Sequence, residues 1–219
     1  MIINPYTFVT GSGSGDPYWS SVKSLAHFDV DFSDSAGAVW TPGTGIIDTS
    51  DSKFGTGCLK SSGGAPAIHM SSTIPKPSSS DDFTFEMFYK PVTLGRFFNT
   101  YPISGTTENN MIFDSATSKL TLYTIGINPL TSSPTAMATG NWYHVAWSRN
   151  GGVSRFYVAG ILQGSYADAY VYSLSTIYLL TNNYANAAIA GKMNEFRYTL
   201  GVGRYPTSFA PPTAPFLNH

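Results

Sequence analysis

The sequence has 219 residues, of which 15% are aromatic and only 11% are charged, and its net charge is −1 at pH 7. So few charges exclude a chain kept unfolded by charge repulsion, and the lack of any Lys/Arg run argues against a nucleic-acid partner. The length suits one large β-sandwich or two small domains, and either can bury a sizeable core.

The first residues show no basic segment followed by an uninterrupted apolar one, so we expect no signal peptide. Nothing approaches the roughly 18 to 20 apolar residues that cross a membrane, so we expect no membrane insertion. The lone cysteine, Cys58, cannot form an internal disulfide and reads as a small buried hydrophobe.

Residues 1–17 differ from the rest of the chain. A Gly/Ser run, residues 11–15, behaves as a flexible hinge after an apolar start. The segment is either an ordinary linker or loop, or an arm that docks on a neighbouring subunit. The docking residues of such an arm are Ile2, Ile3, Tyr6 and Phe8. Both interpretations place one domain at residues 18–219.

Beyond the hinge, short apolar or alternating runs are separated by Gly, Pro, Ser and Asn clusters, which predicts strands throughout. Residues 82–89 carry aromatic side chains on both parities, as an inner strand covered on both faces does. Residues 119–123 alternate and predict a strand. Residues 142–147 and 154–158 also alternate, and the Asn150-Gly151-Gly152 turn between them predicts a hairpin.

Two tryptophans in this hairpin, Trp142 and Trp147, differ by five positions and therefore point to opposite faces of one strand. One of the two tryptophans should therefore lie in the core. Residues 170–180 and 193–198 supply further strands. The proline-rich stretch 205–216 is expected to run extended along the edge of the sandwich.

Five segments together resemble a known family, the laminin G-like, concanavalin A-like jelly rolls that are frequent in bacteriophage structural proteins. They are residues 18–29, the Lys53-Phe54-Gly55 turn, residues 82–88, residues 141–160 and residues 191–212. The family often has aspartate where Asn194 stands. The resemblance also implies that Trp142 is the core tryptophan, with Trp147 on the other face and partly accessible. The resemblance implies an all-β fold, a jelly-roll β-sandwich of two antiparallel sheets.

Glycoside hydrolases on this fold place a nucleophile and an acid/base carboxylate on neighbouring positions of one strand. The chain has only the glutamates Glu86, Glu108 and Glu195, and none has an Asp two or three residues away on the required parity. The four histidines share no metal-ligand spacing. We therefore expect no enzymatic activity and no catalytic residues.

Three carboxylates, Asp29, Asp31 and Asp34, lie within six residues, a density that could hold Ca²⁺ together with loop carbonyls. Capping of local turns by aspartate side chains explains the same pattern. Both interpretations stay open, and Ca²⁺ is the only cofactor considered.

The 14 Tyr, 14 Phe and 4 Trp residues exceed what one core needs, so several tyrosines should be exposed. Clustered tyrosines and amides could stack on and hydrogen-bond to sugars, or form a subunit interface. The candidate residues are Tyr166, Tyr170, Tyr172, Tyr178, Asn182, Asn183 and Tyr184.

The resemblance implies a non-enzymatic bacteriophage virion surface protein: a capsid decoration protein, head fibre or tail-associated subunit. It would be made in the host cytoplasm and, as a homo-oligomer, contact capsid or tail subunits. The alternative is a carbohydrate-binding lectin or adhesin that contacts host surface glycans.

Overall fold

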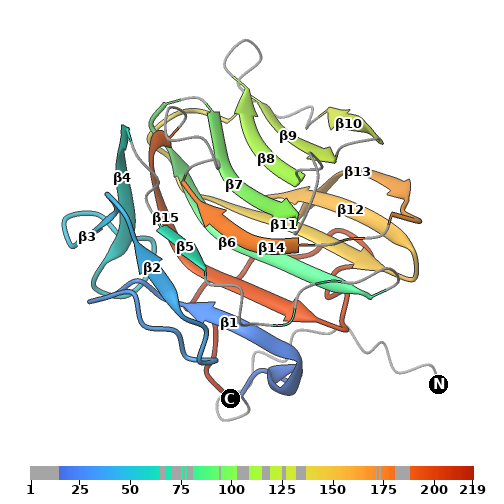
Figure 1. Cartoon of the computed structure of the whole chain (residues 1–219), viewed down its shortest axis with the longest axis horizontal. Coiled ribbons are helices and arrows are strands. Elements are labelled where there is room, and N and C mark those ends of the chain that lie inside the picture. The colour runs from blue at the N-terminus through green and yellow to red at the C-terminus, as the bar shows by residue number, and fades with distance from the viewer. Residues whose placement is uncertain are drawn as a thin grey trace.

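The computed structural model describes residues 15–64, 68–70, 75, 77, 81–93, 95–102, 109–114, 119–124, 127–131, 137–170, 172, 174–180 and 188–219. Within these ranges the chain forms two antiparallel sheets and a short 3-10 helix, η1 (Trp19–Ser21). Figure 1 shows the sheets packed face to face, so the expected all-β sandwich is confirmed. In the described part of the chain, no helix has the length and apolar character needed to cross a membrane.

Sheet A has eight strands, in the order β13-β12-β11-β6-β15-β4-β3, with β1 paired to β15. Their bounds are β1 (Val22–Ala26), β3 (Ile46–Asp48), β4 (Cys58–Gly64), β6 (Phe83–Pro91), β11 (Tyr143–Asn150), β12 (Val153–Val158), β13 (Ile161–Ala167) and β15 (Ala188–Leu200).

Sheet B has seven strands, in the order β10-β9-β8-β7-β14-β5-β2. Their bounds are β2 (Trp40–Pro42), β5 (Ile68–Met70), β7 (Gly95–Pro102), β8 (Asn109–Asp114), β9 (Lys119–Thr124), β10 (Ile127–Thr131) and β14 (Leu174–Leu179). The predicted strand at 119–123 is β9. The one predicted at 170–180 is shorter, because β14 begins only at Leu174.

The aromatic strand predicted at 82–89 is β6, which lies between β11 and β15 in the middle of sheet A. Its residues are buried on both faces except for Lys90, which is half-buried. Phe85, Met87 and Tyr89 point into the core, and the residues between them point to the outer face of sheet A. Both parities are apolar because both faces of this strand are covered.

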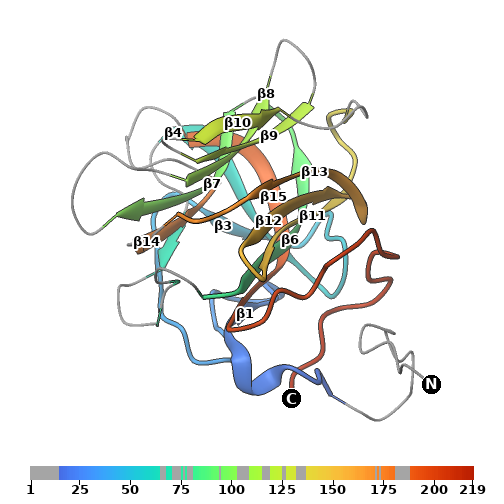
Figure 2. The ribbon, with the colours of Figure 1, turned by 90° about the vertical axis from the view of Figure 1, so that its right-hand side faces the viewer.

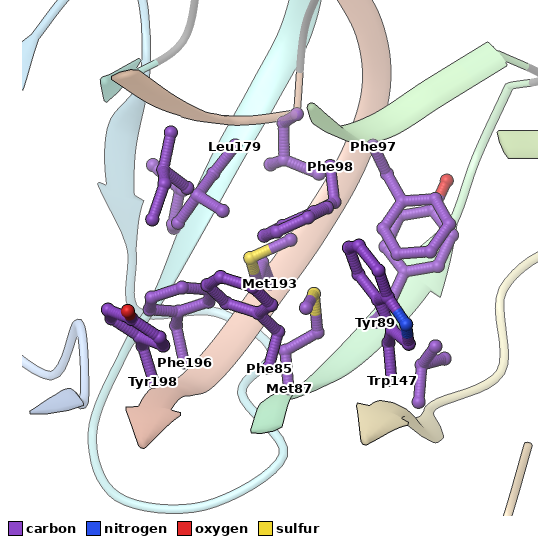
Figure 3. Packing of buried hydrophobic residues seen from close by; sticks show 14 of the residues in the cluster. Phe85, Met87, Tyr89, Phe97, Phe98, Trp147, Leu179, Met193, Phe196 and Tyr198 are labelled. Carbon is purple, nitrogen blue, oxygen red and sulfur yellow. The ribbon is translucent and has the colours of Figure 1, made fainter. Parts of the chain in front are cut away.

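The core between the sheets is built largely from aromatic rings (Figure 3). Tyr89 of sheet A stacks on Phe97 of sheet B with ring centroids 4.1 Å apart, and Phe85 stacks on Tyr198 at 4.5 Å. Such offset ring pairs stabilise a core beyond their buried area. These contacts connect β6 to its neighbour β15 and to the facing sheet.

The predicted hairpin is confirmed. Strands β11 and β12 pair from Asn150 and Val153 outward, and Gly151 and Gly152 form the turn with φ of 57° and 73°. A two-residue turn with positive φ at both positions matches the right-handed twist of the strands, and glycine adopts it without strain.

The tryptophan assignment was wrong in one respect. The two indoles do lie on opposite faces, but Trp147 is the fully buried one. It stands opposite Phe85 and Phe156, both in the core, and its Nε1 donates to Ser154 Oγ at 3.1 Å. Trp142 is half-buried and packs on the outer-face cluster around Phe88. The sequence could not choose, because both faces of β11 are covered.

The C-terminal tail covers the outer face of sheet A instead of lining its edge, which corrects the expectation for residues 205–216. Figure 2 shows it running across sheet A toward β1. Tyr205 and Phe209 pack on Ala146 and Tyr157, and Phe216 packs near Phe88. The face needs this cover because its own residues are apolar.

Replacing Trp147 by alanine should lower the free energy of unfolding by about 3 to 5 kcal/mol, through lost burial and the cavity that remains. Trp142→Ala should cost clearly less, because that ring is half-buried. Denaturant unfolding of both variants measures the difference. Equal and small losses would contradict the register of β11 described above.

Candidate functional site

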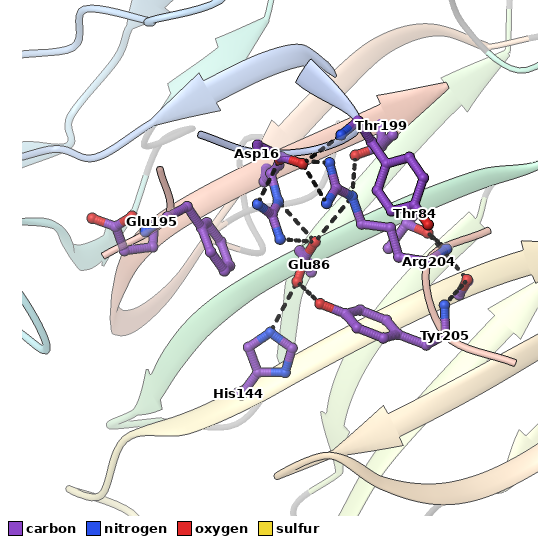
Figure 4. Close-up of polar contacts among 12 residues, drawn as sticks. Asp16, Thr84, Glu86, His144, Glu195, Thr199, Arg204 and Tyr205 are labelled. Carbon is purple, nitrogen blue, oxygen red and sulfur yellow. Dashed lines mark hydrogen bonds and ion pairs between the residues drawn. The ribbon is translucent and has the colours of Figure 1, made fainter. Parts of the chain in front are cut away.

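A carboxylate buried under the tail, that of Glu86, lies at the centre of the outer face of sheet A (Figure 4). Glu86 follows core residue Phe85 in β6, so alternation turns its side chain away from the core. In the neighbouring strands, Arg197 of β15 and Ala146 of β11 stand directly opposite. The side chain of Glu86 is fully buried.

Both carboxylate oxygens of Glu86 have close partners. Arg197 donates from Nε to Oε1 at 2.9 Å, and its Nη2 lies 2.8 Å from the same oxygen. The Tyr205 hydroxyl donates to Oε2 at 2.6 Å, and His144 Nε2 lies 3.1 Å from Oε2. The tail residue Tyr205 is thereby tied to the centre of the sheet.

A second carboxylate, that of Asp16, completes the network. Its Oδ2 accepts from Arg197 Nη1 at 2.9 Å and from Arg204 Nη2 at 2.7 Å. Two carboxylates thus face two guanidinium groups, and the buried charges balance. Asp16, which the sequence analysis placed in the arm and hinge before residue 18, is instead joined to sheet A.

Burial alone would raise the pKa of Glu86, but the charge of Arg197, the hydrogen bond from His144 and the charge of Arg204 lower that pKa well below its usual value. A general acid or base must exchange protons with a bound substrate. A buried carboxylate that stays ionised and has both oxygens engaged is suited to holding the tail, not to that chemistry.

The other described glutamate, Glu195, sits in a β-bulge. Asn194 pairs with Phe88 and Arg197 pairs with Glu86, so two residues of β15 stand opposite Met87. Glu195 has a φ of 58°, which is strained for a residue with a side chain.

From the bulge, the Glu195 carboxylate holds both the tail and a loop. Oε2 accepts from the backbone N–H of Phe216 at 2.8 Å, and His27 Nδ1 lies 2.8 Å from Oε1. His27 Nε2 in turn lies 2.9 Å from Asn218 Oδ1. The hydrogen bond with Glu195 raises the pKa of His27 to about 9, against the opposing effect of burial. The imidazolium form therefore bridges Glu195 to the tail.

Asn194, where the family often has aspartate, fixes the nearby loops. Its Oδ1 accepts from the backbone N–H of Phe54 at 2.9 Å, and its Nδ2 donates to the carbonyls of His27 at 2.6 Å and Gly57 at 3.1 Å. An aspartate could not make the two donations, so the amide suits this position.

Three of the candidate tyrosines gather at the β13 end of sheet A, around Asp168. Tyr166 and Tyr170 are half-buried and pack against the core. Tyr172 is only 2% exposed and donates from its hydroxyl to Asp168 Oδ2 at 2.7 Å. The expectation that Tyr172 is exposed was wrong, because the buried carboxylate of Asp168 offers its hydroxyl a partner away from water.

Tyr178 lies apart from that group, in sheet B. It is half-buried, and its neighbours in β14, Ile177 and Leu179, are buried in the core. Alternation therefore places Tyr178 on the outer face of sheet B. Its strand register continues across six strands as one row of directly opposite positions: Thr41, His69, Tyr178, Asn99, Asn110 and Tyr123.

The three aspartates considered for Ca²⁺ bond to different partners. Asp34 accepts from Ser24, the backbone of Leu25 and Ala36, and the indole of Trp40. The carboxylates of Asp29 and Asp31 accept from the backbone N–H groups of Thr56 and Ser33, respectively. In the described part of the chain, no three His, Cys, Asp or Glu residues converge as a metal site would require. Turn and loop capping accounts for these three carboxylates.

The remaining candidate residues lie outside the described part of the chain. They are Asn182, Asn183 and Tyr184, and the arm residues Ile2, Ile3, Tyr6 and Phe8.

The sequence analysis missed the ion network of Asp16, Glu86, Arg197 and Arg204. A signal was present, because Glu86 and Arg197 lie within strands rich in apolar residues, and charges in such strands are buried only when paired.

Glu86→Ala should lower the free energy of unfolding by about 3 to 5 kcal/mol, because it leaves the buried guanidinium of Arg197 without its closest partner. Asp31→Ala removes an exposed carboxylate and should change stability little. Urea unfolding of the two variants checks this. Equal changes in the free energy of unfolding in the two variants would contradict a buried network.

Stability should fall as pH rises from about 6.5 to about 9, because the pKa of His27 is raised from its usual 6.5 to about 9 in the folded protein. Protonated His27 stabilises the fold fully below the lower value, and this contribution is lost as pH passes through the upper one. Unfolding measured at a series of pH values should show a flatter profile in His27→Gln. An unchanged profile in that variant would assign the pH dependence to other groups.

Several solved structures share the fold of this chain at low sequence identity. Domain 4 of AbnA, a GH43 extracellular arabinanase from Geobacillus stearothermophilus, in complex with arabinotriose, is 18% identical, with a TM-score of 0.61 over 83% of this chain and 93% of that chain. Trypanosoma rangeli sialidase in complex with 2,3-difluorosialic acid is 11% identical, with a TM-score of 0.63 over 82% of this chain. The chain spans 31% of that sialidase chain. At these identities the likeness shows the fold.

A search of curated proteins finds no match to the chain. A model of the laminin G type, described as the concanavalin A-like lectin/glucanases superfamily, matches residues 62–199. That range takes in most of both sheets, including β6 and β15, and more than half of the sequence. The chain therefore belongs to the concanavalin A-like lectin/glucanases superfamily.

Proposed function

We propose that the protein is a non-enzymatic, carbohydrate-binding module that recognises surface glycans through the outer face of sheet B. The observation that carries the proposal is the position of Tyr178, a half-buried tyrosine on the outer face of sheet B, with the exposed Thr41 two strands away in the same row. Asn99, directly opposite Tyr178 in β7, is fully buried and is not offered to a ligand. Aromatic rings offer apolar faces to sugars, and amides and hydroxyls offer hydrogen bonds.

The other sheet is less suited to the same task. The middle of its outer face is covered by the tail, with Tyr205 and Phe209 over β11 and β12. The similarity to an arabinanase domain solved with arabinotriose supports carbohydrate binding, because the two chains match over nearly the full length of that domain.

The absence of catalysis is part of the proposal. Most glycoside hydrolases use two carboxylates that both reach the substrate. Glu86 and Glu195 are buried and already bonded to arginine, histidine, tyrosine and backbone groups. Incubation with arabinan and sialyllactose should release no sugar, and release by the wild-type protein but not by a Glu86→Gln variant would overturn this part.

Tyr178→Ala should weaken binding to a glycan identified on an array by about tenfold, since a lost ring contact and hydrogen bond together contribute roughly 1.5 kcal/mol. Tyr166→Ala is the matched control, because Tyr166 is also a half-buried tyrosine on a strand but lies in sheet A. Thermal unfolding confirms that both variants fold. Loss of binding in Tyr166→Ala alone would move the site to the Asp168 group, and an array without any hit, in Ca²⁺ or EDTA, would reject the function.

A second proposed role is attachment to a bacteriophage virion as a capsid decoration, head-fibre or tail-associated subunit. The observation that favours it is that the domain is joined to sheet A from Asp16 onward, because Asp16 forms ion pairs with Arg197 and Arg204. The apolar residues of 1–14 precede this anchor in the sequence, and their proposed role is to dock on a neighbouring virion subunit. This role and glycan binding are compatible.

Deleting residues 1–14 should abolish co-sedimentation with virions that lack the protein, while the thermal transition stays nearly unchanged because Asp16 remains. The intact chain is the positive control. A truncated protein that still attaches would contradict the docking role, and one that unfolds at a much lower temperature would show that the segment is part of the core.

A further inference from the structure

Three lysines lie side by side on the outer face of sheet A, beyond the part covered by the tail. Lys192 of β15 stands directly opposite Lys60 of β4 on one side and Lys90 of β6 on the other. Neighbouring strands are about 4.8 Å apart, and like charges at opposite positions destabilise a sheet. The chain has only 12 Lys and Arg residues in all, so this row concentrates a large part of its positive charge.

Two aspartates only partly balance the row. Asp51 lies 2.8 Å from Lys90 Nζ and 2.9 Å from Lys192 Nζ, and Asp48 lies 2.9 Å from Lys192 Nζ. Lys60 has the longest of these contacts, 3.3 Å to Asp48. Three ammonium groups therefore face two carboxylates, and the excess positive charge lies at the Lys60 end, where the side chain is 39% exposed.

A hollow of about 210 Å³ opens beside this end of the row. It is lined by Lys60, Ser61 and Ser62 of β4, by Ala190 and Lys192 of β15, and by Val92 after β6. Neither Asp48 nor Asp51 is among the residues that line it. An entering group would meet Lys60, whose side chain is 39% exposed, and the exposed Ser62, whereas Lys192 is 12% exposed and its Nζ already contacts both aspartates.

A half-buried indole borders the opposite end of the row. Trp142 Nε1 points to Asp51 Oδ1 at 3.4 Å, so the aspartate that pairs two of the lysines also orients the ring.

We propose that the hollow beside Lys60 and Lys192 binds the anionic group, carboxylate or sulfate, of an acidic saccharide. An oxygen anion there completes the charge balance of the row and accepts a charge-assisted hydrogen bond from the Lys60 ammonium, since the Lys192 ammonium already donates to Asp48 and Asp51. This inference rests on the proposed carbohydrate binding and names its ligand class. It places the anion on sheet A, separate from the Tyr178 row on sheet B.

The test compares polygalacturonate, heparin and neutral arabinan as ligands of the intact protein, by calorimetric titration at low and high salt. Lys60→Gln should weaken binding of the acidic ligands by about tenfold at low salt and leave arabinan unaffected, because one charged hydrogen-bond donor is lost. Lys23→Gln is the matched control, because it changes the net charge by the same amount. Lys23 lies on β1, and its one described hydrogen bond is to the carbonyl of Ser20. Lys60→Arg should retain binding.

Polygalacturonate carries only carboxylates, so binding of that ligand identifies a carboxylate as sufficient. Heparin carries both groups, so binding of heparin without binding of polygalacturonate identifies the anion as a sulfate. Equal losses in Lys60→Gln and Lys23→Gln would overturn the inference, because they would reflect net charge alone. Binding of arabinan with no binding of either acidic ligand would also overturn it while leaving the proposed function intact. Failure to bind any glycan would reject both.

Discussion

The buried ion network on sheet A is the constraint on which the rest of the structure depends. A carboxylate at the centre of an apolar strand must be paired and hydrogen-bonded, because an isolated buried charge is very costly. Glu86 obtains its partners from segments far apart in sequence: Arg197 in β15, His144 in β11 and Tyr205 in the tail. Removing one member would leave its partners buried and unpaired, so the network ties the placement of the tail to that of the strands beneath it.

The tail that this network holds determines which parts of the surface are covered. The tail and the bulge at Glu195 occupy the middle of the outer face of sheet A, where a ligand would otherwise find carboxylates and a histidine. Away from the tail, the side chain of Lys60 on sheet A is 39% exposed and Tyr178 on the outer face of sheet B is half-buried. The two proposed binding surfaces therefore lie on different sheets and differ in chemistry.

Local patterns predicted local structure well. The Asn150-Gly151-Gly152 turn and the two-faced strand at 82–89 were read correctly, because turn chemistry and hydrophobic parity act within a few residues. What failed depended on distant partners. Trp142 and Trp147 could not be ranked without knowing that the tail covers one face of their strand, and Tyr172 could not be recognised as buried without Asp168 opposite its hydroxyl.

The same limit explains why the site was the hardest part to predict. Carboxylate spacing in the sequence directed attention to Asp29, Asp31 and Asp34, yet each of these serves its own turn or loop. The three lysines that form a row are separated by 30 and 102 positions in the chain, and only the order of β4, β15 and β6 brings them together. Binding surfaces on a sheet run across strands, perpendicular to the sequence, so strand order must be known before such a site can be seen.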